Sequence, residues 1–209
     1  MNKFEPDDFC IIANNCWGAE VYKRYNLPFN TPIIGLYFYP DDYLNFILNL
    51  RKNLKTEVRF VKISKHIENQ KHPVGVVNGI EIHFLHYESE EVAFEKWTKR
   101  CKRVLENDKK LFFKFDDRDG ATADHIHRFH QMEMHNRICF TKDSFTEYAN
   151  NFRIPMPSSE LSVMDGFDQF YVADKYFSLG KWLTGKGIVS STKQKLFLKA
   201  KEVKDRLVD

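Results

Sequence analysis

The chain has 209 residues and a net charge of +3, because 32 Lys and Arg residues oppose 29 Asp and Glu residues. Hydrophobic residues make up 43% and aromatic residues 15%, a composition that supports a large core and excludes an intrinsically disordered chain. The two signs of charge are interspersed, so nucleic acid is not expected as a partner. No apolar run approaches the ~18 residues that a membrane-spanning helix needs.

Compartment is indicated by the N-terminus and by the cysteines. The first residues, MNKFEPDDF, lack the basic and apolar regions of a secretory signal. Cys10, Cys16, Cys101 and Cys139 form no C-x-x-C pair, which favours reduced thiols. We therefore expect a cytoplasmic protein.

The first third of the chain alternates between strand and helix patterns. Apolar or alternating runs predict three strands, at 9–14, 33–39 and 58–63. Residues with helical apolar spacing lie between them and predict two helices, at 18–26 and 41–54.

A hairpin and a capped helix follow. Asn78-Gly79 lies between two β-rich runs and predicts a type I′ turn, so 80–87 is expected to be a strand. Ser89 can cap a helix over 89–105, with acidic residues in its first turn and basic residues in its last. The remaining pattern predicts strands at 111–115 and 138–140, a loop at 152–167, and helices at 122–135, 168–184 and 191–208.

Strands alternate with helices along the chain, which predicts one α/β domain over 1–209. We expect a largely parallel sheet with helices on both faces and one antiparallel hairpin. Residues 185–209 are expected to form a basic C-terminal helix.

The stretch IEIHFLHY contains two histidines three residues apart, His83 and His86. Successive side chains of a strand point to opposite faces, so these two cannot bind one metal ion without a bulge. His86 lies at the end of the predicted strand, and we expect it to be the functional one.

In open α/β sheets, ligands bind outside the carboxyl ends of the strands. Polar residues follow four predicted strands here, and they would face one crevice if those strands were parallel. The alternative is that each set only caps its own helix. We assign catalysis to His86 and Cys16 and substrate binding to the other strand-end residues Asn14, Asn15, Trp17, Tyr87 and Arg118.

An apolar strand followed by Asp117-x-Asp119 resembles two known motifs. One is the D-x-D of nucleotide-sugar glycosyltransferases, in which carboxylates hold Mg²⁺ or Mn²⁺ against a diphosphate. The other is the D-x-D-G of haloacid-dehalogenase-type phosphatases, but Ala121 stands where that family has Thr. We expect Asp117 and Asp119 to bind Mg²⁺ or Mn²⁺; a simple turn into a helix is the structural alternative.

Cys16 precedes a predicted helix, where the helix dipole can lower the pKa of a thiol. This position favours a nucleophile, although burial as an inert thiol is the commoner outcome. Trp17 could stack on a sugar or a base, or lie in the core.

The segments NNCWG, IGL, IHFLHY, EKW…R at 95–100 and DRDGAT resemble a bacterial family of uncharacterised proteins. Members are often labelled exopolysaccharide or capsule biosynthesis proteins. The likeness covers roughly residues 9–182, with Ala13 and Ala19 standing where the family commonly has Ser and Gly. It implies a role in making surface polysaccharide and implies no established reaction.

Two functions of different classes remain. The first is an enzyme that transfers or modifies a sugar on a nucleotide-linked substrate, which predicts that Asn14, Trp17, His86 and Asp117 share one pocket. The second is a non-catalytic scaffold or accessory protein of a polysaccharide-assembly complex, which predicts scattered positions and an apolar surface patch.

The predicted C-terminal helix generates a prediction about membranes. Apolar residues recur on one face, while residues 191–208 carry six Lys or Arg against Glu202 and Asp205, a local charge of +4. A solvated basic face is one interpretation. The other is contact with anionic lipid at the inner membrane surface, where each basic residue contributes about 1 kcal/mol.

If the helix meets lipid, vesicle sedimentation should show binding to anionic but not to neutral vesicles. Binding should fade at high salt and on replacing the lysines, because the attraction is electrostatic. Absence of binding to anionic vesicles at low salt would leave this segment with a structural role only.

Overall fold

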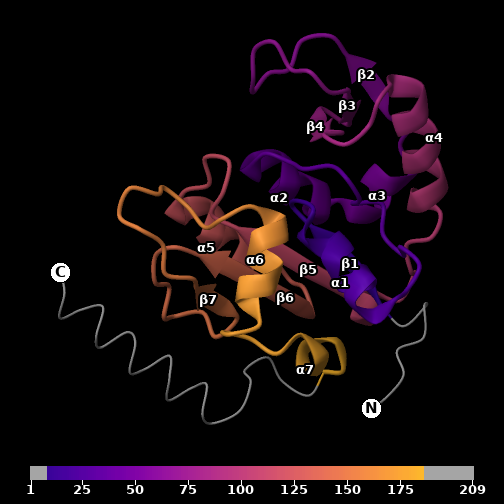
Figure 1. The fold of residues 1–209 in the computed structure, drawn as a ribbon. Coiled ribbons are helices and arrows are strands. Elements are labelled where there is room, and N and C mark those ends of the chain that lie inside the picture. Colours follow the sequence, from indigo (N-terminus) through magenta and orange to yellow (C-terminus); the bar gives the residue numbers. More distant parts are fainter. Residues whose placement is uncertain (1–8, 186–209) are drawn as a thin grey trace.

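The computed structural model describes residues 9–185, which form two sheets (Figure 1). The first is parallel, with the strand order β1-β5-β6-β7. Its strands are β1 (Cys10–Ala13), β5 (Leu111–Asp116), β6 (Asn136–Thr141) and β7 (Asn151–Arg153). The second is antiparallel and consists of β2 (Arg59–Val61), β3 (Val74–Val77) and β4 (Ile80–His83).

Alternation along β1 explains why both faces of the parallel sheet are covered. Cys10 and Ile12 belong to one hydrophobic core, whereas Ile11 and Ala13 belong to another. The second core includes residues of α1 (Trp17–Tyr25), α6 (Gly166–Ala173) and α7 (Leu179–Leu183). The first includes residues of α2 (Pro40–Leu48), α3 (Leu50–Lys55) and α5 (Ala123–Gln131). The expected α/β architecture, with helices on both faces, is therefore confirmed.

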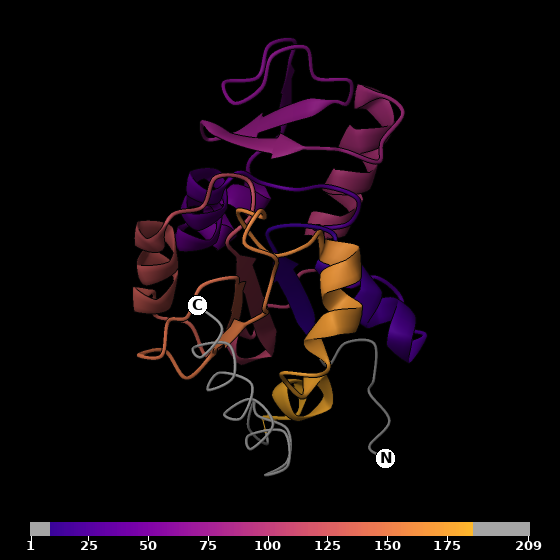
Figure 2. The same ribbon diagram turned by 60° about the vertical axis from the view of Figure 1, so that its left-hand side comes forward.

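The antiparallel sheet lies above the parallel sheet together with α4 (Glu90–Cys101) (Figures 1 and 2). Trp97 of α4 packs edge-on against Phe84, with ring centroids 5.9 Å apart. Asn78 and Gly79 have φ angles of 51° and 81°, as the predicted type I′ turn requires. The two strands of this hairpin pair from Val77 and Ile80 onward.

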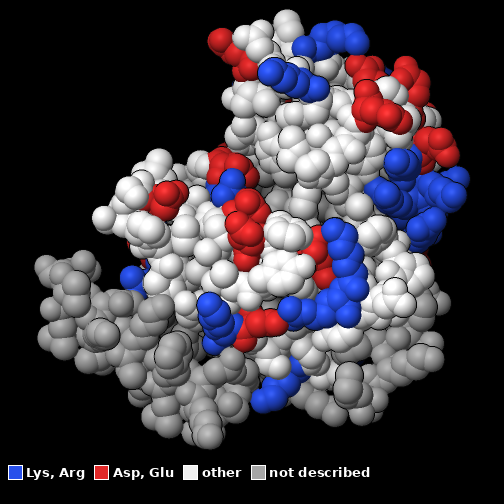
Figure 3. Space-filling model, viewed as in Figure 1, with Lys and Arg blue, Asp and Glu red and all other residues white. Residues whose placement is uncertain are grey.

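The predicted polarity of α4 is also present. The side chain of Ser89 accepts a hydrogen bond from the backbone N–H of Val92. Acidic residues occupy the first turn and basic residues the last, which suits the helix dipole. Figure 3 shows the two signs as neighbouring patches over this helix, within a surface where charges are otherwise mixed.

Two predicted strands differ in the structure. Only Tyr37 of segment 33–39 pairs, in an isolated bridge to His83, because Gly35 turns the backbone with φ of 69°. Segment 80–87 leaves the sheet after His83, where the N–H of Leu85 turns back to the His83 carbonyl. The hairpin is thus outside the parallel sheet, and the premise that these two segments end as parallel strands of one sheet is wrong.

Several predicted boundaries also shift. The helix at 41–54 is divided at Asn49, and the helix at 168–184 is divided into α6 and α7. The predicted loop at 152–167 includes most of β7. The predicted helix at 191–208 lies outside the described residues. Within residues 9–185, no helix is both long enough and apolar enough to cross a membrane.

Candidate functional site

A buried polar cluster lies at the carboxyl edge of the parallel sheet. Asp116 ends β5 and is 0% exposed. The side-chain amides of Asn14 and Asn15, which follow β1, donate to its two oxygens at 2.7 Å each. Gln169 of α6 donates to the same carboxylate at 3.2 Å, and the ammonium of Lys114 also contacts it. We call these five residues the strand-end cluster.

The sequence produces this cluster through the two-residue period of β5. Lys114 and Asp116 share the face of β5 opposite to Phe113 and Phe115. Parallel pairing sets Ala13 beside Lys114, so Asn14 and Asn15 emerge next to Asp116. The Lys114 ammonium also donates to Oδ1 of Asn14 and of Asn15 at 3.2 Å each. The charged and amide groups of the cluster therefore meet partners of complementary chemistry, apart from Oε1 of Gln169, which is buried without a hydrogen bond among the described residues.

Charge and burial oppose each other in this pair. Burial would raise the pKa of Asp116, but the Lys114 ammonium and the two asparagine amides outweigh it and lower the pKa. Burial lowers the pKa of Lys114, and Asp116 counteracts this shift. The carboxylate is held ionised in the interior.

A glycine lets α6 approach the cluster. A Cβ atom at Gly166 would lie 2.6 Å from Oδ1 of Asn15 and 2.9 Å from the backbone nitrogen of Trp17. That same Oδ1 accepts a hydrogen bond from the Trp17 N–H at 3.2 Å. Any larger residue at position 166 would displace Asn15 and, through it, the start of α1.

The two carboxylates of the D-x-D sequence have different surroundings. Asp117 accepts hydrogen bonds from the backbone N–H groups of Val163 at 2.9 Å and Lys142 at 2.6 Å, one on each oxygen. Burial raises its pKa to about 6. Asp117 therefore holds two loops together. Between these carboxylates, Arg118 donates to the carbonyl of Val163 at 3.1 Å.

Asp119 is the carboxylate that remains available. It lies in the left-handed region with φ of 56° and is partly buried, and none of the hydrogen bonds or ion pairs within residues 9–185 uses its side chain. Burial and then Asp116 raise its pKa. Burial raises the pKa of both Tyr37 and Tyr39, the neighbouring Tyr39 raises that of Tyr37 further, and the charge of Asp119 makes a smaller contribution in the same direction to both.

Cys16 and Trp17 begin α1 but differ from an exposed reactive pair. Burial is the main cause that raises the pKa of the Cys16 thiol, whose Sγ lies 3.9 Å from the Leu36 carbonyl oxygen. The Trp17 side chain is 1% exposed and packs in the second core. Its ring is surrounded by the aromatic rings of Phe140, Phe170, Phe177 and Trp182.

His86 and Tyr87 follow β4 and approach segment 33–39, which we call the linker, rather than β5. The His86 side chain is exposed, and its backbone N–H donates to the Gly35 carbonyl at 3.0 Å. The Tyr87 hydroxyl donates to the Ile34 carbonyl at 2.6 Å and accepts a hydrogen bond from Arg100. The structure thus brings Asn14, Asn15 and the 116–119 turn together and places His86 and Tyr87 beyond the linker.

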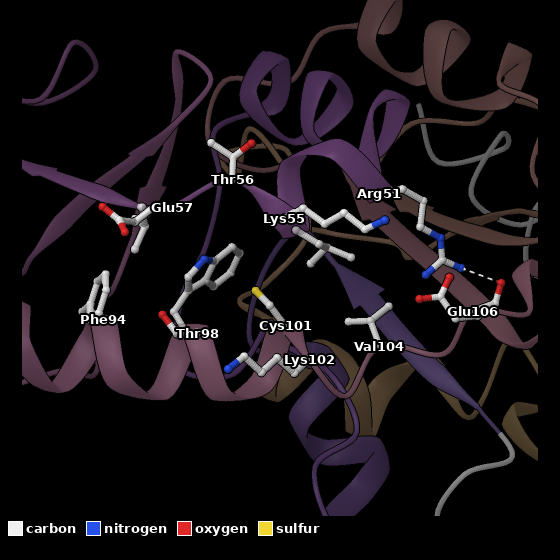
Figure 4. Close-up of a pocket in the computed structure, with 13 residues that line it drawn as sticks. Arg51, Lys55, Thr56, Glu57, Phe94, Thr98, Cys101, Lys102, Val104 and Glu106 are labelled. Atoms are coloured by element: carbon white, nitrogen blue, oxygen red, sulfur yellow. Dashed lines mark hydrogen bonds between the residues drawn. The ribbon is translucent and has the colours of Figure 1, made fainter.

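A separate groove of about 530 Å³ lies between α3 and α4 (Figure 4). Leu54, Trp97 and Val104 contribute apolar groups to it. Three cationic side chains line it, Arg51, Lys55 and Lys102, and Arg51 is bonded to the Glu106 carbonyl and to Asp108. None of the residues that the sequence assigns to the site lines this groove.

Sequence reasoning missed Lys114, Asp116 and Gln169 as members of the cluster. The signal for the first two was present: a lysine and an aspartate two residues apart interrupt one face of an otherwise apolar strand. Gln169 carries no such signal, because its role depends on how α6 packs.

A resident metal site is not formed by the protein alone in the described part of the chain. No group of three or more His, Cys, Asp or Glu side chains there has an arrangement that could hold a metal ion. Asp119 has free oxygens, whereas each oxygen of Asp117 already accepts a backbone hydrogen bond. Asp119 is therefore the member of the D-x-D pair whose oxygens make no hydrogen bond among the described residues.

Comparisons with known proteins place the chain within a family without identifying a reaction. A family model described as "Domain of unknown function (DUF1919)" matches residues 1–183. A protein of Haemophilus influenzae described as "Uncharacterized protein" is 35% identical over 169 residues, which cover 80% of this chain and 78% of that protein. The expected resemblance to a family of uncharacterised proteins is confirmed; neither description mentions exopolysaccharide.

Replacing Asp116 by Asn should reduce the free energy of unfolding by about 3–5 kcal/mol, since it leaves the buried Lys114 charge without its partner. Urea denaturation at pH 7 measures this loss. Asp124→Asn is the control, because that carboxylate is 74% exposed and should change stability by less than about 0.5 kcal/mol. The double variant Lys114→Met/Asp116→Asn should lose less than the two single variants added together. Equal stability of Asp116→Asn and the control would contradict the role given to this pair.

The thiol of Cys16 should react slowly with iodoacetamide at neutral pH, because burial keeps it protonated. Mass spectrometry of native protein should find Cys16 labelled no faster than Cys101, whose pKa burial raises to about 12. Much faster labelling of Cys16 would instead support the nucleophile expected from its position before α1.

Proposed function

The chain belongs to the DUF1919 family, and we propose that it is an enzyme of surface polysaccharide biosynthesis that transfers or modifies a sugar on a nucleotide-linked substrate. The observation that carries this proposal is Asp119, a partly buried carboxylate without a partner in the described chain, whose charge acts on the hydroxyls of Tyr37 and Tyr39. It lies at the carboxyl edge of a parallel sheet, where ligands of such folds bind.

The chemistry of these groups suits a saccharide. Tyrosine rings offer apolar faces to the C–H groups of a sugar, and their hydroxyls donate or accept hydrogen bonds. A free carboxylate accepts hydrogen bonds from sugar hydroxyls. The strand-end cluster beneath would hold these groups in place without contacting the substrate, because Asn14 and Asn15 are 2% and 7% exposed.

Mg²⁺ or Mn²⁺ enters the proposal as an ion that arrives with the substrate. Such an ion commonly binds through one or two carboxylates together with substrate phosphates. Asp119 would supply the protein ligand, and the ion would neutralise charge on the leaving diphosphate. Asp117 contributes by fixing the turn through its two backbone hydrogen bonds.

Replacing Asp119 by Asn should weaken Mn²⁺-dependent binding of UDP- or GDP-sugars at least about tenfold, because the ion loses its protein ligand. Calorimetric titration of the nucleotide-sugars, with and without Mn²⁺, measures the change. Asp124→Asn, a nearby exposed aspartate of α5, should bind like the wild type. Unchanged binding by Asp119→Asn would remove the metal role, and no binding of any nucleotide-sugar by the wild type would remove the proposed function.

The second function is a scaffold in a polysaccharide-assembly complex. Two neighbouring aromatic side chains of α6, Phe167 and Tyr171, are 51% and 53% exposed, with ring centroids 5.1 Å apart. Exposed apolar side chains that lie together favour protein contact. A chain that binds no nucleotide-sugar but loses a partner on Phe167→Ser/Tyr171→Ser would support this function instead.

A further inference from the structure

Two histidines and a glutamate lie in a row outside the strand-end cluster, and we call His72, His83 and Glu81 the histidine triad. Nε2 of His72 lies 3.1 Å from Nδ1 of His83. On the other side of that ring, Nε2 of His83 lies 3.5 Å from Oε2 of Glu81. His83 is 0% and Glu81 5% exposed, whereas His72 is only partly buried. The histidine triad therefore extends from a buried carboxylate to an imidazole at the surface.

One arrangement of protons suits the surroundings of the two imidazoles. The Glu81 carboxylate only accepts hydrogen bonds, and its position 3.5 Å from Nε2 of His83 favours the tautomer that carries a proton on that nitrogen. Nδ1 of His83 is then an acceptor, and Nε2 of His72 must donate to it. This leaves a lone pair on Nδ1 of His72, which no hydrogen bond among the described residues uses. That nitrogen can take a proton from another molecule.

Other side chains hold the histidine triad in place. Glu81 accepts hydrogen bonds from the Ser64 hydroxyl at 2.7 Å and from the Lys65 N–H at 2.9 Å. The Tyr37 ring stacks on His83 at 4.8 Å between centroids. The centroid of the Tyr37 ring also lies 5.9 Å from that of the His72 ring, so Tyr37 contacts both the histidine triad and the region of Asp119.

Both imidazoles are neutral near pH 7. Burial and then His72 lower the pKa of His83 to about 4, and burial lowers the pKa of His72. A neutral imidazole is the form that accepts a proton. The other titratable groups that face His83 are His66, Asp42, Tyr37 and Tyr39.

The contact between His83 and Glu81 in the histidine triad is too long for a hydrogen bond. Nε2 of His83 is buried and makes no hydrogen bond among the described residues, since the 3.5 Å separation from Glu81 is long. An unpaired buried N–H is unfavourable, and a purely structural histidine pair would gain nothing from it. Catalytic hydrogen bonds are often long without substrate and shorten when the substrate binds.

We propose that His72 is the acid–base group of this site and that His83 and Glu81 position it in one tautomer. The proposal rests on the proposed function. When an acceptor hydroxyl attacks the anomeric carbon of the donor sugar, its O–H bond breaks and a new C–O bond forms. The anomeric bond to the diphosphate breaks, and the leaving group keeps the electron pair. The hydroxyl proton goes to Nδ1 of His72. His83 and Glu81 stabilise the resulting imidazolium.

Modification by diethyl pyrocarbonate tests the positioning without any substrate, because the reagent attacks neutral imidazole. Mass spectrometry would follow the rate at His72 against pH, with the exposed His135 as an internal control. Glu81→Gln should move the His72 midpoint to lower pH by roughly half a unit or more, since a negative charge that favours the imidazolium is lost. Glu88→Gln, which removes the charge of an exposed glutamate after β4, should leave it unchanged. If Glu81→Gln does not fold, Glu81→Asp should give a smaller shift in the same direction. An unmoved midpoint would overturn the positioning role.

Turnover tests the acid–base role. His72→Gln should lower kcat at least about 100-fold while nucleotide-sugar affinity, measured by calorimetry, stays unchanged. Full kcat in His72→Gln would overturn that role even though the substrate binds. Failure of the wild type to bind nucleotide-sugars would overturn the proposed function and the acid–base role together, and the reagent experiment would still decide the positioning by itself.

Discussion

The buried carboxylate of Asp116 receives hydrogen bonds from three separate parts of the chain. They come from the end of β1 through Asn14 and Asn15, from β5 and the turn after it through Lys114 and Arg118, and from α6 through Gln169. A charge that is removed from water is unfavourable unless such donors surround it. These donors come together only where β1, β5 and α6 meet, so the carboxylate constrains how the three elements pack. The edge of the sheet is then rigid enough to present the turn that follows.

The linker at 33–39 determines how the antiparallel sheet joins this edge. The N–H of Phe38 donates to the Asn14 carbonyl at 2.9 Å, which connects the linker to the end of β1. One residue earlier, Tyr37 exchanges two backbone hydrogen bonds with His83 of β4, each 3.0 Å long. The two sheets are therefore connected through neighbouring residues of one extended segment. This connection sets the imidazoles of His72 and His83 near the tyrosines and Asp119, although the two groups belong to different sheets.

Local patterns predicted what depends on local physics. The Asn78-Gly79 turn, the capped helix α4 and the apolar strands β1 and β5 follow from φ preferences, helix-end chemistry and side-chain period. The absence of a regular strand at 33–39 was not predictable in the same way. Its apolar residues satisfy a strand pattern, but Gly35 and the bridge from Tyr37 to His83 determine the path of the backbone. The strand-end argument correctly predicted that Asn14 and Asn15 lie next to the turn after β5, since it requires only sheet direction. His72 was missed because its loop brings it to His83 only through tertiary packing.

Three carboxylates within four residues show why a short motif cannot assign chemistry. Asp116 is buried among side-chain donors, Asp117 bonds two backbone N–H groups, and Asp119 bonds no group in the described chain. The sequence D-D-R-D presents the three as equivalent, and alternation alone separates only the first, which continues the strand. Partners distant in sequence decide the rest, because the backbone N–H groups of Lys142 and Val163 each bond one oxygen of Asp117 and hold this carboxylate between two loops. The partners found in the folded chain, rather than the spacing of acidic residues, therefore distinguish the three carboxylates, and of the three only Asp119 makes no side-chain hydrogen bond among the described residues.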